Sequence, residues 1–151
     1  MPDTADSFLL DERELAAWRG FLATHRQLVA ELDSELEREH GLALVSYEVL
    51  LHLNEAEDHS LRMGDLADHL LLSRSGLTRL VDRLVARGLV ERHSCPSDRR
   101  GTYARLTPEG LARFEEARPT HLRGVREHFL SHIPARDLDR LAAIWQRVLP
   151  G

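Results

Sequence analysis

The stretch from Ser73 to Leu106 constrains the fold most, because a helical pattern is followed directly by two strand-like patterns. Ser73 is a suitable N-cap, and Gly88 can end the helix in the left-handed conformation that glycine adopts easily. The apolar side chains between them recur at helical spacing: Leu77, Leu80, Val81, Leu84 and Val85. Residues 89–92 and 103–106 are strand-like, and the loop between them holds turn-forming residues. The pattern predicts a helix that buries this apolar face, followed by a β-hairpin.

A second short helix is expected just before this segment. Leu66, Ala67 and Leu70 mark its apolar side, and it is preceded by a helix over residues 46–56, a polar break and a short extended link at residues 61–63. Two short helices joined by a tight turn are typical of a helix-turn-helix, and a hairpin that follows them forms a wing. The sequence therefore predicts a mainly α fold with a small β-hairpin wing.

Long amphipathic helices are expected at both ends of the chain. Asp11 and Glu14 have the spacing of a capping box, and apolar residues then recur at helical intervals until Gly41. Thr107 and Pro108 are a suitable cap and first residue for a later helix. A further helical stripe follows near the C-terminus: Leu138, Leu141, Ile144, Trp145, Val148 and Leu149.

The apolar stripes of these end segments are larger than a small domain can cover. We therefore predict that residues 1–45 and 108–151 form a helical dimerisation region, and that residues 46–107 form the winged helix-turn-helix domain. The alternative is that both stripes belong to the core of a single monomer.

Charge is sorted along the chain. The net charge is −5, yet residues 73–105 hold eight arginines and three acidic residues, which leaves twelve basic and twenty-two acidic residues elsewhere. A basic segment in an acidic chain is typical of a protein that binds a polyanion such as DNA. A solvated basic surface is the simpler alternative.

The polar face of the helix that begins at Ser73 has side chains suited to duplex DNA. Five of them lie on or beside the side opposite the apolar face: Ser75, Thr78, Arg79, Asp82 and Arg83. Arginine can donate two hydrogen bonds to guanine, and threonine can contact a thymine methyl group. Ser73 and Ser75 lie near the positive end of the helix, where a phosphate is favoured. An amphipathic helix with an arginine-rich surface would show the same pattern.

The expected hairpin carries arginines at its tip. Arg99 and Arg100 lie in the loop, where a guanidinium group can enter the narrow minor groove. Asp98 would be repelled by DNA phosphates, so we expect it to anchor Arg100 through a charge-assisted hydrogen bond.

One stretch resembles a known family. "SRSGLTRLVDRLVARGLVER", followed by Asp98, Arg100, Leu106, Thr107 and Gly110, is similar to MarR-family transcriptional regulators, and the resemblance extends over nearly the whole chain. It implies a homodimeric winged helix-turn-helix repressor or activator that binds a pseudo-palindromic operator in double-stranded DNA and often releases it when a small aromatic or phenolic ligand or an oxidant arrives. Of the two roles, we expect a ligand-responsive repressor.

The resemblance also implies roles for individual residues. Arg100 would be the minor-groove residue of the wing, and Arg99 would contact phosphate. The residues implied to contact DNA from the recognition helix are Ser73, Arg74, Ser75, Thr78, Arg79 and Arg83. The family pattern places a ligand pocket between the dimerisation helices and the DNA-binding lobes. Trp18, Phe21, Tyr47 and His52 are wall residues by type, but residues of these types are more often plain core, so we do not assign them to a site.

Other switches are less favoured by the sequence. Cys95 lies in the wing, whereas peroxide-sensing relatives keep a reactive cysteine in the N-terminal helix, so a structural role is expected despite nearby arginines. His121, His128 and His132 are spaced to share a helical face, but no third ligand stands at a diagnostic spacing. We expect no metal and no cofactor.

The remaining classes find little support. The sequence has no phosphate-binding loop or nucleophile elbow, so an enzyme is not expected. A winged helix used only for protein contacts would be expected to lack the wing arginines. With no apolar run of membrane-spanning length, an acidic N-terminal segment and one cysteine, we expect a cytoplasmic protein without a membrane partner.

Overall fold

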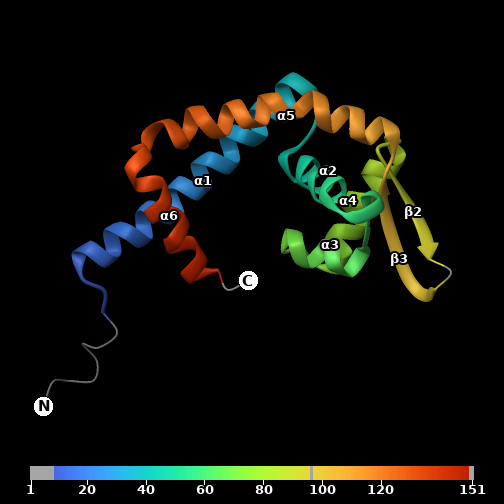
Figure 1. Ribbon diagram of the computed structural model, residues 1–151, viewed down its shortest axis with the longest axis horizontal. Helices are drawn as coiled ribbons and strands as arrows, with labels where there is room; N and C mark the ends of the chain where they lie inside the picture. Colours follow the sequence, from blue (N-terminus) through green and yellow to red (C-terminus); the bar gives the residue numbers. More distant parts are fainter. Residues whose placement is uncertain (1–8, 96, 150–151) are drawn as a thin grey trace, which may run out of the picture.

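The computed structural model describes residues 9–95 and 97–149, apart from the side chains of Cys95, Asp98, Arg99 and Arg100. The elements follow in the order α1 (Glu12–His40), α2 (Leu44–Glu55), η2 (Glu57–His59), β1 (Ser60–Arg62), α3 (Met63–Leu70), α4 (Arg74–Ala86), β2 (Val90–Cys95), β3 (Asp98–Leu106), α5 (Pro108–His128), η3 (Leu130–His132) and α6 (Ala135–Val148). Figure 1 shows α5 running across the top of a lobe that contains α2, α3, α4 and the hairpin, and α1 rising from the lower left to meet α5. The fold class is the predicted one.

The helix ends form where the sequence places them. The Asp11 carboxylate accepts a hydrogen bond from the Glu14 amide at 2.8 Å, and the Glu14 carboxylate accepts one from the Asp11 amide at 2.9 Å, which completes the expected capping box of α1. Ser73 caps α4 by accepting from the Gly76 amide at 3.0 Å. Gly88, which follows α4, has a φ of +74°, the left-handed conformation expected there.

The apolar side of α4 is buried with one exception. Leu77, Leu80, Val81 and Leu84 are almost fully inaccessible and pack into the main core, whereas Val85 is 37% exposed. The prediction that Val85 belongs to the buried face is therefore wrong. Successive residues of a helix are rotated by about 100°, so Val85 and Leu80 lie at opposite edges of the apolar face. The edge that holds Val85 borders the solvent-exposed side of α4.

The wing is a sheet of three strands in the order β1-β3-β2. β2 and β3 form the expected hairpin, with Val90 opposite Leu106. β1 pairs antiparallel with β3, placing Leu61 opposite Ala104, so part of the segment predicted to be an extended link is a strand. A strand of three residues is too short to show an alternating pattern, so its pairing with β3 could not be predicted from the sequence.

The C-terminal half of α1 packs against α5, while the two apolar ends remain accessible. In α1 only Leu32 and Leu36 are buried, and no described residue of α6 is buried. Large apolar side chains in the terminal elements are exposed: Leu9, Leu10, Trp18, Phe21, Leu22, Val29, Leu138, Ile144, Val148 and Leu149. Figure 1 shows α6 folding back beside the N-terminal half of α1. The described chain does not bury these stripes as the core of a monomer.

Gly110 permits a close approach between the start of α5 and the base of the hairpin. A Cβ atom at this position would overlap the Leu89 carbonyl oxygen and would lie 2.8 Å from Leu106 Cδ1. Thr107 caps α5 by accepting from the Gly110 amide at 3.0 Å and donates to the Gly88 carbonyl at 2.6 Å. These contacts fix the start of α5 against the end of α4 and the base of the hairpin.

Candidate nucleic-acid interface

The exposed side of α4 brings together the residues predicted to contact DNA. All six of them are solvent-exposed: Ser73, Arg74, Ser75, Thr78, Arg79 and Arg83. None of the arginines in this set forms an ion pair with a described side chain, so their guanidinium groups face solvent with their donors available. The core on the opposite face holds the helix in place, and the surface that remains is polar and basic.

Three hydroxyl groups at the N-cap and in the first turns of α4 already have intramolecular partners. The Ser73 hydroxyl accepts from the Gly76 amide and lies 3.3 Å from the Ser75 hydroxyl, and the Thr78 hydroxyl donates to the Arg74 carbonyl at 2.8 Å. The side chain of Ser73 therefore serves as the N-cap of α4 in the structure. Thr78 keeps its methyl group and oxygen lone pairs for an external partner.

Arg92 is a site residue that sequence reasoning missed. Its guanidinium reaches from β2 to the Asp82 carboxylate at 2.7 Å and donates to the Thr78 carbonyl at 3.2 Å. Asp82 therefore pairs with the sheet, which explains an acidic residue beside a basic face. The pair joins residues on two elements, and no local sequence spacing encodes that contact.

A polar hollow of about 820 Å³ lies between α3, α4 and the sheet. Its lining includes Arg62, Arg74, Thr78, Arg92 and Thr102. The guanidinium of Arg62 lies 5.9 Å from the Tyr103 ring centroid, a cation–π arrangement at the base of the wing. The hollow thus gathers arginines from the helix-turn-helix and from the sheet, together with Asp65, Asp68 and Asp82.

The tip of the wing carries the other predicted residues. Asp98 is the first residue of β3, opposite Cys95, where the strand register shifts, and Arg99 and Arg100 follow it in the strand. The side chains of these four residues lie outside the described part of the structure. The predicted anchoring of Arg100 by Asp98 stays a prediction.

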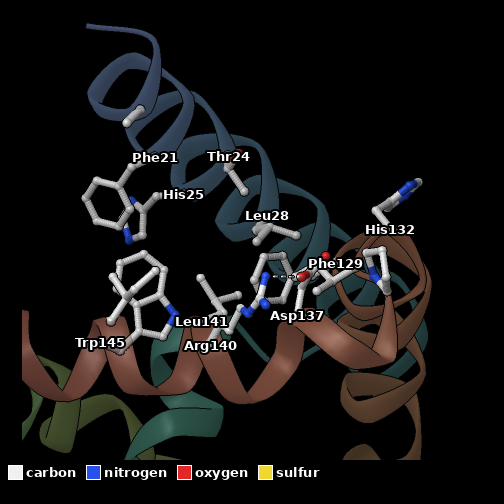
Figure 2. A pocket seen from close by; sticks show the side chains of 14 residues that line it. Phe21, Thr24, His25, Leu28, Phe129, His132, Asp137, Arg140, Leu141 and Trp145 are labelled. Atoms are coloured by element: carbon white, nitrogen blue, oxygen red, sulfur yellow. Dashed lines mark ion pairs between the residues drawn. The ribbon is translucent and has the colours of Figure 1, made fainter. Parts of the chain in front are cut away.

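Cavities also lie away from α4, and two of them bear on the predicted ligand pocket. One of about 680 Å³ opens between α1 and α6, where Phe21 faces Trp145 with ring centroids 5.7 Å apart and Leu28 faces Leu141 and Phe129 (Figure 2). The other, of about 490 Å³, lies between α1, α2 and α3.

Of the residues named as pocket walls by type, His52 lines the cavity between α1, α2 and α3, and Phe21 lines the cavity between α1 and α6. Tyr47 is buried in the core against Phe114, with ring centroids 5.3 Å apart. Trp18 is 53% exposed and lines neither cavity.

A helix-turn-helix followed by a sheet with a hairpin, and carrying a basic exposed helix, defines the winged helix-turn-helix class. Comparison with known proteins then gives the family: the model described as "MarR family" matches residues 40–101, and the chain belongs to this family of transcriptional regulators rather than to a family of enzymes.

Solved structures agree over nearly the whole chain. AbsC, a MarR-family transcriptional regulator from Streptomyces coelicolor, is 36% identical, with 93% of this chain and 94% of that chain covered and a TM-score of 0.87. Sco3205, a MarR-family regulator from the same organism solved in complex with DNA, is 34% identical, with 93% and 88% covered and a TM-score of 0.87.

The curated multiple antibiotic resistance protein MarR of Salmonella typhimurium is 29% identical over 86 residues. That match covers 57% of this chain and 60% of that protein's length. Within residues 9–95 and 97–149, none of the helices combines the length and apolar character that crossing a membrane requires.

Proposed function

We propose that this chain is a homodimeric, sequence-specific DNA-binding transcriptional regulator, and that it acts as a ligand-responsive repressor. The exposed basic side of α4 is the observation that carries the proposal. Three arginines there have no described acidic partner, and the helix projects beside the wing. An α-helix fits the major groove, and the wing beside it would contact the neighbouring minor groove.

Roles follow from position on this surface. Arg79 and Arg83 lie on the exposed side of α4 and would contact base edges, with Thr78 beside them. Ser73, Arg74 and Ser75 at the start of α4 would contact phosphate, where the helix N-terminus favours an anion. Arg99 and Arg100 at the wing tip would contact phosphate and the minor groove.

The exposed apolar stripes support a homodimer. Ile144 and Val148 in α6 and Trp18 and Phe21 in α1 are each at least 44% exposed. Apolar side chains gathered on the same pair of elements are typical of an interface between protomers. Two α4 helices related by a two-fold axis would then read a pseudo-palindromic operator.

A small aromatic or phenolic ligand would fit the cavity between α1, α2 and α3. Val29, Leu44 and Val45 give it apolar walls, and the rings of His52 and His69 lie 5.1 Å apart at its edge. Burial, followed by the nearby charge of His69, lowers the pKa of His52, so a neutral imidazole is available to a phenolic hydroxyl. This cavity joins α1 to the helix-turn-helix, where an occupant can change their relative position.

The test is selection from a random duplex library with the full chain, in the presence of excess bulk DNA, combined with the mass of the free protein by light scattering. We expect an enriched sequence with inverted half-sites about one helical turn apart and a mass twice the chain mass of 17.2 kDa. Enrichment of no sequence, or salt-sensitive binding that bulk DNA abolishes, would contradict the proposal, because phosphate contacts alone give salt dependence.

A further inference from the structure

A histidine and carboxylates cluster where α1 packs against the C-terminal end of α5. His128, the last residue of α5, lies between two acidic residues on successive turns of α1. Its Nε2 atom is 2.6 Å from Glu35 Oε1, and its Nδ1 atom is 3.0 Å from Glu31 Oε2. Both ring nitrogens therefore face a carboxylate, and the ring orientation is fixed from two sides.

The structure separates the three histidines whose spacing suggested a shared face. His121 packs against Tyr47 of α2, with ring centroids 4.5 Å apart, and α5 ends at His128, so His132 lies beyond it in η3. The additional ligands come instead from α1 and from the neighbouring position on α5. This arrangement depends on how α1 packs against α5, and the spacing of histidines along one helix does not predict that packing.

The carboxylate of Glu35 fits into this cluster because α5 has a glycine where the two helices meet. Its side chain is only 16% exposed, and its Oε2 atom is buried without a hydrogen-bond partner among the described residues. A Cβ atom on Gly124 would lie 2.5 Å from that oxygen, so the absence of a side chain at Gly124 makes the space that the carboxylate fills. A buried carboxylate oxygen without a partner is costly unless something else satisfies it.

Glu127 completes the cluster. One ligand atom from each of Glu35, Glu127 and His128 lies within 4.8 Å of the others. With Glu31 included, three carboxylates surround one imidazole, so the cluster keeps a negative charge even when the imidazole is protonated. The last turn of α5 adds the partial negative charge of a helix C-terminus. The electrostatic field here favours a cation.

We propose that Glu35, Glu127 and His128 form a binding site for a divalent transition-metal cation of the Zn²⁺ type. Imidazole and carboxylate ligands at about 2.0 to 2.2 Å are typical of such ions, and small side-chain rotations would bring these groups to that range. The metal takes the ring nitrogen that faces Glu35, and the other nitrogen donates its N–H to Glu31. A carboxylate behind a histidine ligand fixes the ring and increases its basicity.

Metal binding at this position would join α1 to α5. Glu35 comes from α1, whereas Glu127 and His128 come from α5, so one ion links both helices. Without a metal, the imidazole of His128 pairs with the carboxylates of Glu31 and Glu35. The metal-bound and metal-free states differ in thermal unfolding temperature, which is measured without DNA. The proposal is therefore independent of the proposed function.

The experiment is calorimetric titration of the chelator-treated full chain with Zn²⁺ alone. We expect one Zn²⁺ per chain and an increase in the thermal unfolding temperature. His128→Gln and Glu35→Gln should each weaken binding at least tenfold, and Glu31→Gln should weaken it by roughly ten- to a hundredfold. Glu127 is exposed, so Glu127→Gln preserves the fold and tests the site if the Glu35 variant unfolds.

His59→Asn is the matched control, because His59 lies in η2, outside the cluster, and should leave the affinity unchanged. Mg²⁺ should not compete, since it prefers a site built entirely of oxygen ligands. Absence of Zn²⁺ binding, or equal affinity in the parent, His128→Gln and Glu127→Gln proteins, would overturn the proposal and leave the cluster as an ion-paired contact between helices.

Discussion

Arg92 in β2 and Asp82 in α4 lie 2.7 Å apart and join the wing to the proposed recognition helix. Asp82→Asn separates two interpretations of this pair. If Asp82 only repelled DNA, its neutralisation would strengthen operator binding. We expect instead that the affinity falls by roughly three- to tenfold, equivalent to at most about 1.4 kcal/mol, because Arg92 loses its anchor.

Fluorescence anisotropy with the selected operator measures this change. Thermal stability should change little, since the pair is partly exposed and such pairs contribute about 1 kcal/mol or less. Glu91→Gln is the matched control: it removes the same charge from a pair within the sheet, where Glu91 lies 3.8 Å from Arg105, without touching α4. An equal effect of the two variants would argue against a specific link.

Arg79→Ala tests direct reading of base edges. Arg79 is exposed on α4, so its removal should preserve the fold and reduce discrimination at one base pair of each half-site by about 1 to 3 kcal/mol. Selection from the random library with the variant measures the loss of preference at that position. Arg136→Ala, an exposed arginine on α6, removes the same charge as a control. An unchanged sequence ranking would identify Arg79 as a phosphate contact.

Gly110→Ala should destabilise the chain because the added methyl group would meet backbone. The methyl group would overlap the Leu89 carbonyl oxygen, and a backbone atom there cannot rotate away as a side chain can. We expect the free energy of unfolding to fall by about 1 to 3 kcal/mol. Gly64→Ala, with no atom within 4 Å of its added methyl group, should change stability by about 1 kcal/mol or less.

Chemical denaturation at a fixed protein concentration compares these two glycine variants, because the stability of a dimer depends on concentration. A similar midpoint for Gly110→Ala and the parent would show that the wing moves away from α5 at little cost.

His121 should make stability depend on pH. Burial lowers the pKa of His121 below the ordinary value of 6.5, and its Nδ1 atom has no hydrogen-bond partner among the described residues. The folded state therefore favours the neutral ring. This contribution to stability is present above about pH 6.5 and is lost as the pH falls below it, because the unfolded chain gains the proton more readily.

His121→Phe should weaken that acid dependence. Phenylalanine can keep the contact with Tyr47, whose ring centroid lies 4.5 Å from that of His121, but it cannot be protonated. Denaturation curves at about pH 7.5 and about pH 5.5, on either side of the ordinary histidine pKa, should differ less for the variant than for the parent. The same pH difference in both proteins would assign the acid sensitivity to other groups.

Much of the fold was predictable because its signals are local. The capping box at Asp11 and Glu14, the cap at Ser73 and the left-handed Gly88 each depend on residues a few positions apart. Helical spacing likewise identified the buried side of α4. The basic side opposite it followed from the same periodicity, so the candidate interface on α4 could be proposed from the sequence alone.

Contacts between elements could not be obtained in this way. The pairing of β1 with β3 involves three residues, and the Arg92 link to Asp82 joins a strand to a helix. Each is decided by packing between segments that the chain brings together only on folding.

By itself, the sequence determined the helices and their caps, the hairpin, the sorted charge and the basic face of α4, because hydrophobic periodicity and turn chemistry act over a few residues. Tertiary structure alone decided that Arg92 pairs with Asp82, and that Glu31 and Glu35 of α1 face His128 of α5 across a space left by Gly124. The physical reason is that these contacts depend on the relative position of packed elements, which no spacing within one element specifies.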